Sequence, residues 1–527
     1  MPNTSKKDIF QGIPIPAVAS PRSKTFIYPT FRTSLAFLSG IAIFLTFFRR
    51  QDVAMISVGS GTPVPRDSCP QVASITPLKH LTLLEQLEET FVDENFRQDS
   101  YHKLGGAVQI PTVTYDDLRP PGEDSRWDIY VEFHQFLASS FPLVHSILNK
   151  TTVNSYALAY HWQGSDTSLK PVLLTAHQGF AHFPCHSESL MTNHLTDVVP
   201  IDPDTLQEWI HPPFSGTFDA IESLLQKGFK PTRTVVLAYG IDEERGGISG
   251  ATAIRDYLLS NYGKNAFSIL VDEGGGHEIR DNIIIATPSV AEKGHFDLRM
   301  RVSAPGGHSS VPPDHTTIGI LAALIVELEA HPYTPHLYRN DVYYTNLQCQ
   351  AAYDPDLDTD FRALIARSLT SDKALSELED KIFKSSLQIK AMGSTTQATD
   401  IIHGGVKVNA LPEEAFAVVN HRIATYSSVS AVKAHIAATL LPVVKKLGLS
   451  LEAFGQEIEV LSRETIGRLS LTDAWGTALE PAPVTPTTGN PAYEFLSGTI
   501  ISTAKSTIRT NHTDKPVIVA PGIPTGS

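Results

Sequence analysis

Three short apolar runs in this chain are each followed by side chains that can bind a metal ion. They are Val172–Ala176 before His177, Thr234–Tyr239 before Asp242-Glu243-Glu244, and Phe267–Val271 before Asp272. Neighbouring carboxylates repel one another and resist burial, so an apolar strand that ends on three of them requires a nearby cation. A metal ion is the simplest candidate, with one carboxylate as a ligand and its neighbour free to transfer protons.

Helical segments separate these runs, and this alternation predicts an α/β fold. Strands that alternate with helices form a mostly parallel sheet, and sites in such sheets lie beyond the carboxyl ends of the strands. We therefore expect the three strand ends to share one edge of a sheet.

A second unit is expected from residue 291. Its expected elements are a strand at 295–302, a helix at 317–330, strands at 388–392 and 414–423, and a helix at 428–447. This order favours a small α+β insert of the ferredoxin-like type, with one sheet and two helices. We place the insert at 291–459 and the α/β domain at 76–290 and 460–527.

Composition limits the classes of partner. The 527 residues are enough for about two or three domains. A net charge of −14 argues against a nucleic-acid partner, which binds basic surfaces. The sequence has three cysteines, Cys69, Cys185 and Cys349. A small, odd number of cysteines does not indicate a disulfide framework, so they do not identify the cellular compartment.

The N-terminal sequence predicts a membrane anchor. Residues 33–48 are uncharged and mostly apolar, and they follow a polar lead at 1–32. The run is short beside the roughly 20 apolar residues of a spanning helix, but no small-residue cleavage site follows, which favours a signal anchor over a cleaved signal peptide. We expect 1–32 to be cytosolic, 49–75 to be a stalk, and the body to be lumenal, where Asn149 and Asn511 begin usable glycosylation sequons. The alternative for 33–48 is a buried helix or an imperfect signal sequence.

Six short motifs are spread over residues 80–527. They lie at 173–178, 197–200, 240–244, 271–275, 305–310, and 405–412 with His421-Arg422. In combination they resemble the carboxypeptidase S branch of the aminoacylase and glutamate carboxypeptidase family of dinuclear zinc peptidases. The resemblance implies a zinc-peptidase α/β domain, an inserted lid that forms a homodimer, and two zinc ions per subunit.

The resemblance also implies roles for the residues at the strand ends. His177, Glu244 and Asp272 would bind zinc, and Asp197 would orient His177 from behind. Glu243 would be the general base that activates the metal-bound water and passes its proton to the leaving amine. Without the other motifs, the acidic run reads as a solvated turn.

The lid motifs supply the remaining candidates. His308 resembles the histidine that a partner subunit's lid contributes to the oxyanion. Asn409 and Arg422 resemble the pair that binds the substrate, and an arginine suits the free carboxylate that a carboxypeptidase must recognise. On their own, His308 reads as an ordinary loop residue and Arg422 as an exposed strand residue.

The first metal motif is interrupted. Related sequences place one residue between the histidine and the aspartate, whereas here Asp197 follows Gln178 by 19 residues. Deleting residues 179–196 would restore the motif, and we interpret them as an insertion from a retained intron or a gene-model error. The alternative is that histidines of this segment are additional ligands: His182, His186 and His194.

Two further departures affect the metal site. Residues 213–219 resemble the stretch before the aspartate that bridges the two zinc ions, but Asp219 leads directly into 220–225, which resembles the following helix. The bridging aspartate and the terminal zinc-binding histidine, expected beyond Ser527, have no counterpart, and His512 lies too early. Three ligands divided between two ions would bind both poorly, so we expect little or no activity and a doubtful second zinc site.

The resemblance implies a carboxypeptidase that hydrolyses the C-terminal peptide bond of small peptides. Its partners would be small peptides or N-acyl amino acids with a free carboxylate, a second copy of the chain, and a membrane. Anchored relatives act in the vacuole, so a vacuolar lumen is the expected location. The alternatives are an N-acyl amino acid hydrolase of the aminoacylase type, or an inactive relative that dimerises or binds peptides.

Overall fold

The computed structural model describes a large part of the chain beyond residue 63. The described residues are 64–115, 117–178, 180–181, 215–272, 276–280, 282–458, 465–506 and 515–523. The predicted tail at 1–32 and the predicted anchor at 33–48 lie outside the described residues. Within the described residues, no helix has the length and apolar character needed to cross a membrane.

The α/β domain is built on a five-stranded sheet. Its strands, in the order β2-β3-β6-β4-β7, are β2 (Asn149–Val153), β3 (Ala157–Trp162), β6 (Val235–Gly240), β4 (Val172–His177) and β7 (Ile269–Val271). The pairs β6–β4 and β4–β7 are parallel, whereas β2–β3 and β3–β6 are antiparallel. The parallel part of the sheet therefore coincides with the three runs singled out in the sequence.

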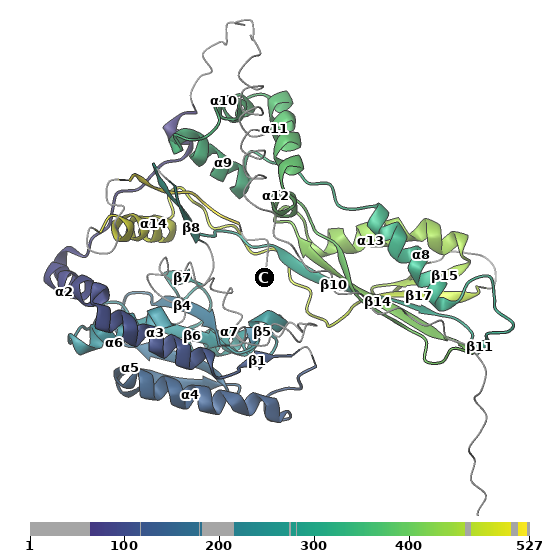
Figure 1. Cartoon of the computed structure of the whole chain (residues 1–527), viewed down its shortest axis with the longest axis horizontal. Helices are drawn as coiled ribbons and strands as arrows, with labels where there is room; N and C mark the ends of the chain where they lie inside the picture. Colours follow the sequence, from purple (N-terminus) through teal and green to yellow (C-terminus); the bar gives the residue numbers. More distant parts are fainter. Residues whose placement is uncertain are drawn as a thin grey trace, which may run out of the picture. The chain divides into compact units, whose positions relative to one another are not determined.

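Helices cover this sheet and complete its core (Figure 1). Those that contribute buried side chains are α4 (Ile129–Ser140), α5 (Pro142–Ile147), α6 (Ser215–Gln226) and α7 (Ala251–Tyr262). The helices α2 (Leu81–Val92) and α3 (Glu94–Val108) precede them, and Asp93 caps α3 by accepting a hydrogen bond from the Phe96 N–H. Tyr130, Trp127 and Tyr160 are among the largest fully buried side chains of this core.

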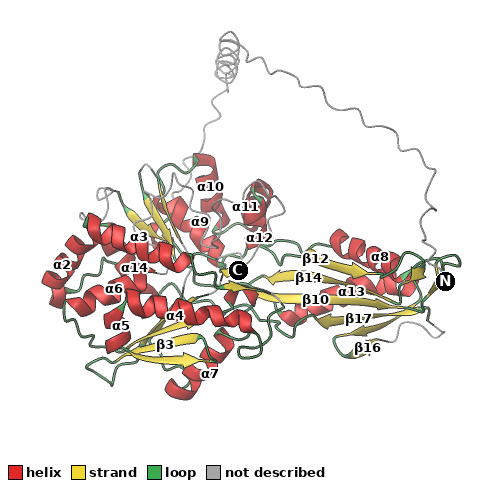
Figure 2. Cartoon of the chain, turned by 60° about the horizontal axis from the view of Figure 1, so that its bottom comes forward, coloured by secondary structure: helices red, strands yellow, loops and turns green. Residues whose placement is uncertain are grey.

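The second unit is a six-stranded sheet with two helices on one face. Its strands, in spatial order, are β12 (Ala398–Gly404), β14 (Glu414–Ile423), β10 (Gly294–Ser303), β17 (Gly467–Asp473), β15 (Leu449–Ala453) and β16 (Gln456–Ile458). Figure 2 shows the long strands of this sheet side by side. Buried and partly exposed residues alternate along β10, so only one face of the sheet lies in the core. The predicted α+β unit is confirmed, as are its strands near 295–302 and 414–423.

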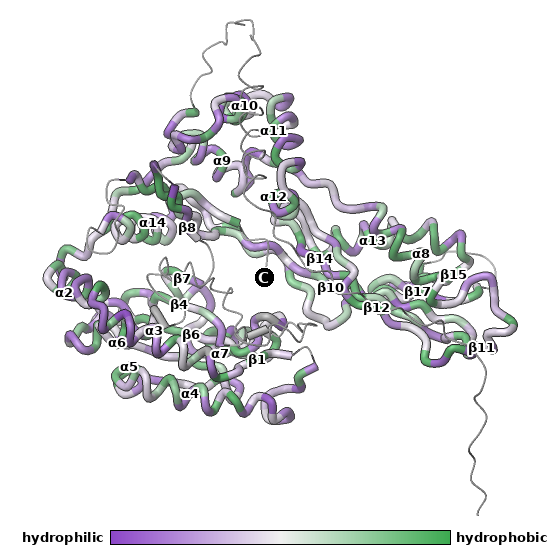
Figure 3. Tube along the Cα trace, viewed as in Figure 1, coloured by the Kyte–Doolittle hydropathy of each residue, from purple (hydrophilic) through white to green (hydrophobic). Residues whose placement is uncertain are grey.

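Helices α8 (Thr317–Ala330) and α13 (Val429–Lys446) supply the other half of that core. Figure 3 shows hydrophobic stretches along α8, which buries Ile320, Leu321, Leu324 and Leu328. Side chains that precede each helix accept hydrogen bonds from its first turn, Thr316 for α8 and Ser428 for α13. Both predicted helices are confirmed.

The structure corrects two details of the insert. Residues 388–392 do not form a strand: they lie in helix α12 (Leu387–Met392), which Ser386 caps by accepting from the Ile389 N–H. The alternation in this short run is equally compatible with a helix, and the cap decides it. The boundary at residue 459 is also too early, because β17 pairs with both β10 and β15 of the six-stranded sheet.

Helices that the sequence analysis did not expect follow α8. They are α9 (Val342–Tyr353), α10 (Thr359–Ser368), α11 (Asp372–Ser385) and the short α12, and the first three share a core of their own with Val64. A three-stranded sheet combines two strands that precede these helices in the chain with one that follows them. Its order is β18 (Val517–Val519), β9 (Ile284–Thr287), β8 (Gly276–Ile279), and α14 (Pro491–Ala504) packs on it.

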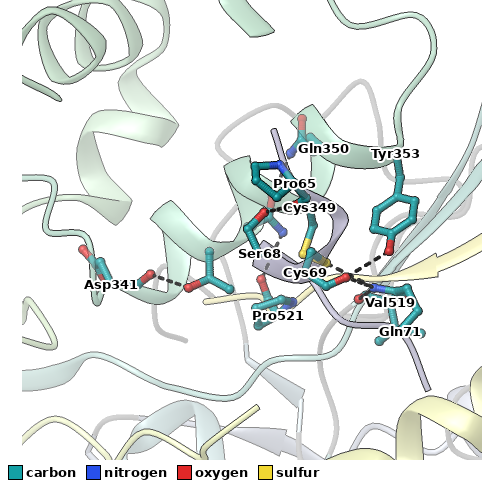
Figure 4. The surroundings of a disulfide bond; sticks show 12 residues. Pro65, Ser68, Cys69, Gln71, Asp341, Cys349, Gln350, Tyr353, Val519 and Pro521 are labelled. Atoms are coloured by element: carbon teal, nitrogen blue, oxygen red, sulfur yellow. Dashed lines mark hydrogen bonds between the residues drawn. A yellow bond between two sulfur atoms is a disulfide. The ribbon is translucent and has the colours of Figure 1, made fainter. Parts of the chain in front are cut away.

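A disulfide joins Cys69 to Cys349 of α9 (Figure 4). Both cysteines are buried, and the Tyr353 hydroxyl donates a hydrogen bond to the carbonyl oxygen of Cys69. Gln71 pairs with both backbone groups of Val519. The sequence predicted no disulfide framework and placed residues 64–75 in a stalk. The odd count of cysteines concealed one pair, and this segment packs on the body.

Candidate active site

The three strand ends meet at one edge of the five-stranded sheet. Strand β4 lies between β6 and β7, with His177 opposite Gly240 and Leu174 opposite Val271. Because these pairings are parallel, the residues that follow each strand emerge at the same edge. His177, the turn that contains Glu243, and Asp272 therefore lie at neighbouring positions, as the sequence predicted.

A buried aspartate shapes the turn after β6. Asp242 is fully buried, and its carboxylate accepts hydrogen bonds from the N–H groups of Ser249 and Gly250, each at 2.7 Å. The 3-10 turn Glu243–Arg245 follows, and Gly246 then takes a left-handed φ of 87°. This arrangement leaves Glu243 only half-buried at the strand edge. Asp242 thus holds the turn in place through backbone N–H groups.

The carboxylate of Asp272 is oriented by a neighbouring strand. The Thr175 hydroxyl donates a hydrogen bond of 2.6 Å to Oδ1 of Asp272. Thr175 lies two residues before His177 on β4, so both side chains project from the same face of the sheet. The sequence analysis missed Thr175, although this spacing of two residues could have indicated it.

Gln178 fixes the end of β4 behind His177. Its buried side chain donates to the Tyr239 carbonyl at 3.0 Å, and its Oε1 lies 3.0 Å from Nε2 of His134. Burial lowers the pKa of His134 to about 4, so this ring is neutral at pH 7 and its Nε2–H donates to the amide oxygen. No sequence signal connects His134 with Gln178, because they are 44 residues apart on different elements.

The described residues do not complete a metal site. Asp197 and the additional histidines lie outside them, and so does the side chain of Glu244. Within the described chain, no three His, Cys, Asp or Glu side chains are grouped so that they could hold one ion. A histidine and carboxylates match zinc in the kind of donor, but those described fall short in number. Asp219 lies inside α6, where Lys103 pairs with it at 3.2 Å.

Two very short strands position His308. Strand β11 (Gly307–His308) pairs with β13 (Ala410–Leu411), which places His308 opposite Ala410, directly after Asn409. The His308 Nδ1 accepts a hydrogen bond from the Ser310 N–H at 3.2 Å and lies 2.7 Å from the Ser310 hydroxyl. An Nδ1 that accepts leaves the hydrogen of the neutral ring on Nε2. His308 is exposed, so this Nε2–H can donate to a bound group.

Arg422 lies near the C-terminal end of β14, whereas β13 and Asn409 precede the start of that strand. Its backbone N–H and carbonyl both pair with Thr396, and β10 places His295 opposite it. In the described part of the chain, its guanidinium makes no hydrogen bond or ion pair. Residues 414 and 422 are eight positions apart on one strand, which corresponds to about 27 Å. The structure therefore does not bring Asn409 and Arg422 together within one chain.

Lys293 stabilises the segment beside Arg422. Its buried ammonium donates hydrogen bonds to the carbonyl oxygens of Ala391 and Ser394, at 2.8 and 2.7 Å. Burial, reinforced by the charge of Arg422, lowers the pKa of Lys293 to about 8. Sequence reasoning missed this residue, because its partners are backbone atoms almost 100 positions away.

Comparisons with known proteins show what the sequence and the fold of this chain resemble. Residues 290–446 match the peptidase dimerisation domain of the M20 family. The chain is 35% identical to carboxypeptidase S of Saccharomyces cerevisiae over 464 residues, which cover 83% of this chain and 76% of that protein. It is 33% identical over 349 residues to the human N-fatty-acyl-amino acid synthase/hydrolase PM20D1, covering 61% of this chain and 62% of that protein. Human carnosine dipeptidase 1 shares the fold, with a TM-score of 0.50 and 12% identity over 84% of this chain and 92% of that one.

Proposed function

Because this chain belongs to the carboxypeptidase S branch of the M20 metallopeptidases, we propose that Glu243, His308 and Arg422 carry its reaction. Its function is that of a metallo-carboxypeptidase, which hydrolyses the C-terminal peptide bond of small peptides. The observation that supports the residue roles is the meeting of β6, β4 and β7 at one edge, with Glu243 in the turn after β6.

Glu243 is the proposed general base. It takes a proton from the attacking water and delivers it to the amine that leaves. The buried carboxylate of Asp242 holds the turn that presents Glu243, so a base that must act repeatedly keeps a fixed position. His308 supplies a hydrogen-bond donor, its Nε2–H, to the oxyanion that develops on the attacked carbonyl.

His177, Glu244 and Asp272 would hold zinc, which when bound would polarise the scissile carbonyl and make the attacking water more acidic. Thr175 and Gln178 keep Asp272 and the end of β4 in place for this purpose. Two zinc ions per subunit are proposed from the family resemblance. We propose that this chain binds the second ion weakly, because Asp219 leads directly into the rest of α6 and the bridging aspartate expected after it has no counterpart in the sequence.

Zinc analysis and an assay on N-blocked dipeptides test these roles together. We expect fewer than two zinc ions per chain and slow hydrolysis that Glu243→Gln reduces by at least about a hundredfold. Glu123→Gln, an exposed carboxylate elsewhere, is the matched control and should leave the rate unchanged. Equal rates for Glu243→Gln and the unaltered chain would contradict the proposed base, and fast turnover with two bound zinc ions would contradict the weak second site.

A second substrate class is favoured by one observation. The human relative that covers 61% of this chain is named for N-fatty-acyl amino acids, which share a free carboxylate next to the scissile amide. Arg422 would bind that carboxylate in either class. The ratio of kcat/KM for an N-fatty-acyl amino acid and for an N-blocked dipeptide with the same C-terminal residue separates the two. We expect the dipeptide to be the better substrate.

The proposed location is the lumen of the vacuole, with residues 33–48 as the anchor and the lid as a homodimer contact. The apolar sequence of 33–48, the buried disulfide and the matched dimerisation domain support this proposal. Extraction of membranes at alkaline pH tests the anchor: the full chain should stay with the membrane, and a chain that lacks 33–48 should not.

A further inference from the structure

An exposed glycosylation sequon lies on an outer strand of the five-stranded sheet. Asn149-Lys150-Thr151 begins β2, which pairs with β3 and, among the described residues, with no other strand. Asn149 and Lys150 are both exposed. Among the described residues, the Asn149 amide makes no hydrogen bond, so nothing in the fold occupies it.

The disulfide is a second, independent observation. Cys69 and Cys349 are 3% and 1% exposed, so the bond forms as the chain folds and not afterwards on the surface. A buried structural disulfide indicates folding in an oxidising compartment, because cytosolic thiols are kept reduced. In eukaryotic cells that compartment also contains the enzyme that modifies Asn-x-Thr sequons.

We propose that Asn149 carries an N-linked glycan. The sugar donor is a lipid-linked oligosaccharide pyrophosphate. Its C1–O bond breaks as the Asn149 Nδ2 forms a bond to C1, Nδ2 loses one proton, and the lipid pyrophosphate leaves. This modification rests on the proposed lumenal location and is independent of the proposed peptidase activity.

The fold sets the order of events at this sequon. In the folded protein the Thr151 hydroxyl accepts a hydrogen bond from the Tyr257 hydroxyl at 3.3 Å, and Thr151 pairs with Ala159 across the ladder. The sequon is therefore modified before β2 joins the sheet. Afterwards Asn149 lies at the exposed start of the strand, so the glycan remains in solvent without disturbing the ladder.

A glycan at this position protects the sheet. Within the part of the chain that the structure describes, β2 has no strand partner on its outer side, and such open edges promote pairing with other chains. Lys150 already places a charge on this edge. A bulky, hydrated sugar on the preceding residue excludes a neighbouring strand more effectively than a single charge.

Expression of the full chain in a eukaryotic secretory host tests the proposal. Asn149→Gln and Thr151→Ala should each remove one glycan step in gel mobility, whereas Thr151→Ser, which preserves the sequon, should retain it. Asn511→Gln is measured beside them, so that the other sequon of the body is counted separately. Glycosidase treatment in heavy-oxygen water should convert Asn149 to a labelled aspartate in the unaltered chain.

Other results would contradict the proposed glycan at Asn149. Identical mobility of Asn149→Gln and the unaltered chain, or an unlabelled peptide at position 149, overturns the proposal, as does a chain that acquires no glycan at all. Glu243→Gln is processed in parallel. A glycan retained on this variant together with lost hydrolysis supports both proposals, whereas a glycan retained with unchanged hydrolysis supports the modification alone.

Discussion

Single residues in this chain are oriented by hydrogen-bonding side chains close to them in space. Thr175 donates to Asp272 from the adjacent strand, and Ser310 donates its N–H to His308 from two residues along the chain. Each contact fixes one lone pair and leaves the rest of the group for a ligand or substrate. Orientation of this kind is what a reacting group needs before a substrate arrives.

The role proposed for Arg422 can be tested by changing that single residue. A guanidinium that has no ion pair in the described chain is available for the C-terminal carboxylate, and a charge-assisted pair of this kind contributes about 3 kcal/mol. Arg422→Met should therefore raise KM by about a hundredfold for a free-carboxylate substrate. Measured on the matching peptide amide, the unaltered chain and Arg422→Met should be equally poor.

Arg301→Met is the matched control for that experiment. Arg301 lies on β10 of the same sheet, is partly exposed and pairs with Glu414 at 3.4 Å. Its replacement should leave KM unchanged. If Arg422→Met discriminated between carboxylate and amide as strongly as the unaltered chain, Arg422 would not be the carboxylate-binding residue.

His421, next to Arg422, predicts a dependence of stability on pH. Its side chain is fully buried and its Nδ1–H is shared between the carbonyl oxygens of Phe296 and Val419. Burial lowers its pKa to about 4, below the ordinary value of 6.5 in the unfolded chain. The stabilisation is therefore complete above pH 6.5 and is lost as the pH falls through 4.

Urea denaturation at several pH values measures this effect. Between pH 7 and pH 4, the unfolding free energy should fall by on the order of 2 kcal/mol from His421, and His134 adds a decrease of the same sign. His421→Leu should flatten part of the slope, whereas replacement of an exposed histidine on α3, His102→Leu, should not. An unchanged slope in His421→Leu would rule out this explanation.

At the residue scale, sequence reasoning identified side chains that belong to contiguous motifs and missed those that act through space. Glu243, His177 and Asp272 each follow an apolar run, and that pattern is visible in the sequence. The contacts of Lys293 with two distant carbonyl groups are not. Backbone acceptors have no residue type, so a pattern of side chains cannot reveal them.

Among the elements, those with strong periodicity and caps could be predicted. Helix α8 begins and ends at the expected residues, because its apolar spacing and the Thr316 cap agree. Helices α9, α10 and α11 were missed, although α11 buries Ala374, Leu378 and Ile382 at a regular spacing of four residues. These helices pack on one another and on Val64. Long-range pairing also placed β17 in a sheet whose other strands precede it.

The disulfide is the element-scale feature with the largest expected effect on stability. It closes a loop of 280 residues and attaches the segment after residue 64 to α9. Removing it should cost about 2–5 kcal/mol of unfolding free energy. Cys69→Ser and Cys349→Ser should lower Tm equally, and the double variant should be no worse than either single one. Cys185→Ser, the remaining cysteine, is the control; a larger loss in that variant would show that the pairing is wrong.

For the whole molecule, the length of the six-stranded sheet in the insert determines how many chains contribute residues to one site. Arg422 lies opposite His295, close to where the chain passes from the α/β domain into the insert, and we therefore propose that it serves the site of Glu243 in its own subunit. His308 lies five residues beyond Ser303, at the opposite end of the same strand pair. Residues 295 and 303 of this strand pair are about 27 Å apart, which is longer than a dipeptide, so the roles proposed for His308 and Arg422 of one chain belong to different sites.

Mixing two inactive variants tests this arrangement. Co-expressed Glu243→Gln and His308→Ala chains should form mixed dimers in which one site is intact, and about a quarter of the unaltered activity should return. Co-expressed Glu243→Gln and Arg422→Met chains should recover nothing. Glu243 and Arg422 of one site come from the same subunit, so every site in a mixed dimer lacks one of the two residues. Size-exclusion chromatography with light scattering checks that each variant still forms dimers. Recovery in the second pair without recovery in the first would reverse the assignment and place Arg422, not His308, in the partner's site.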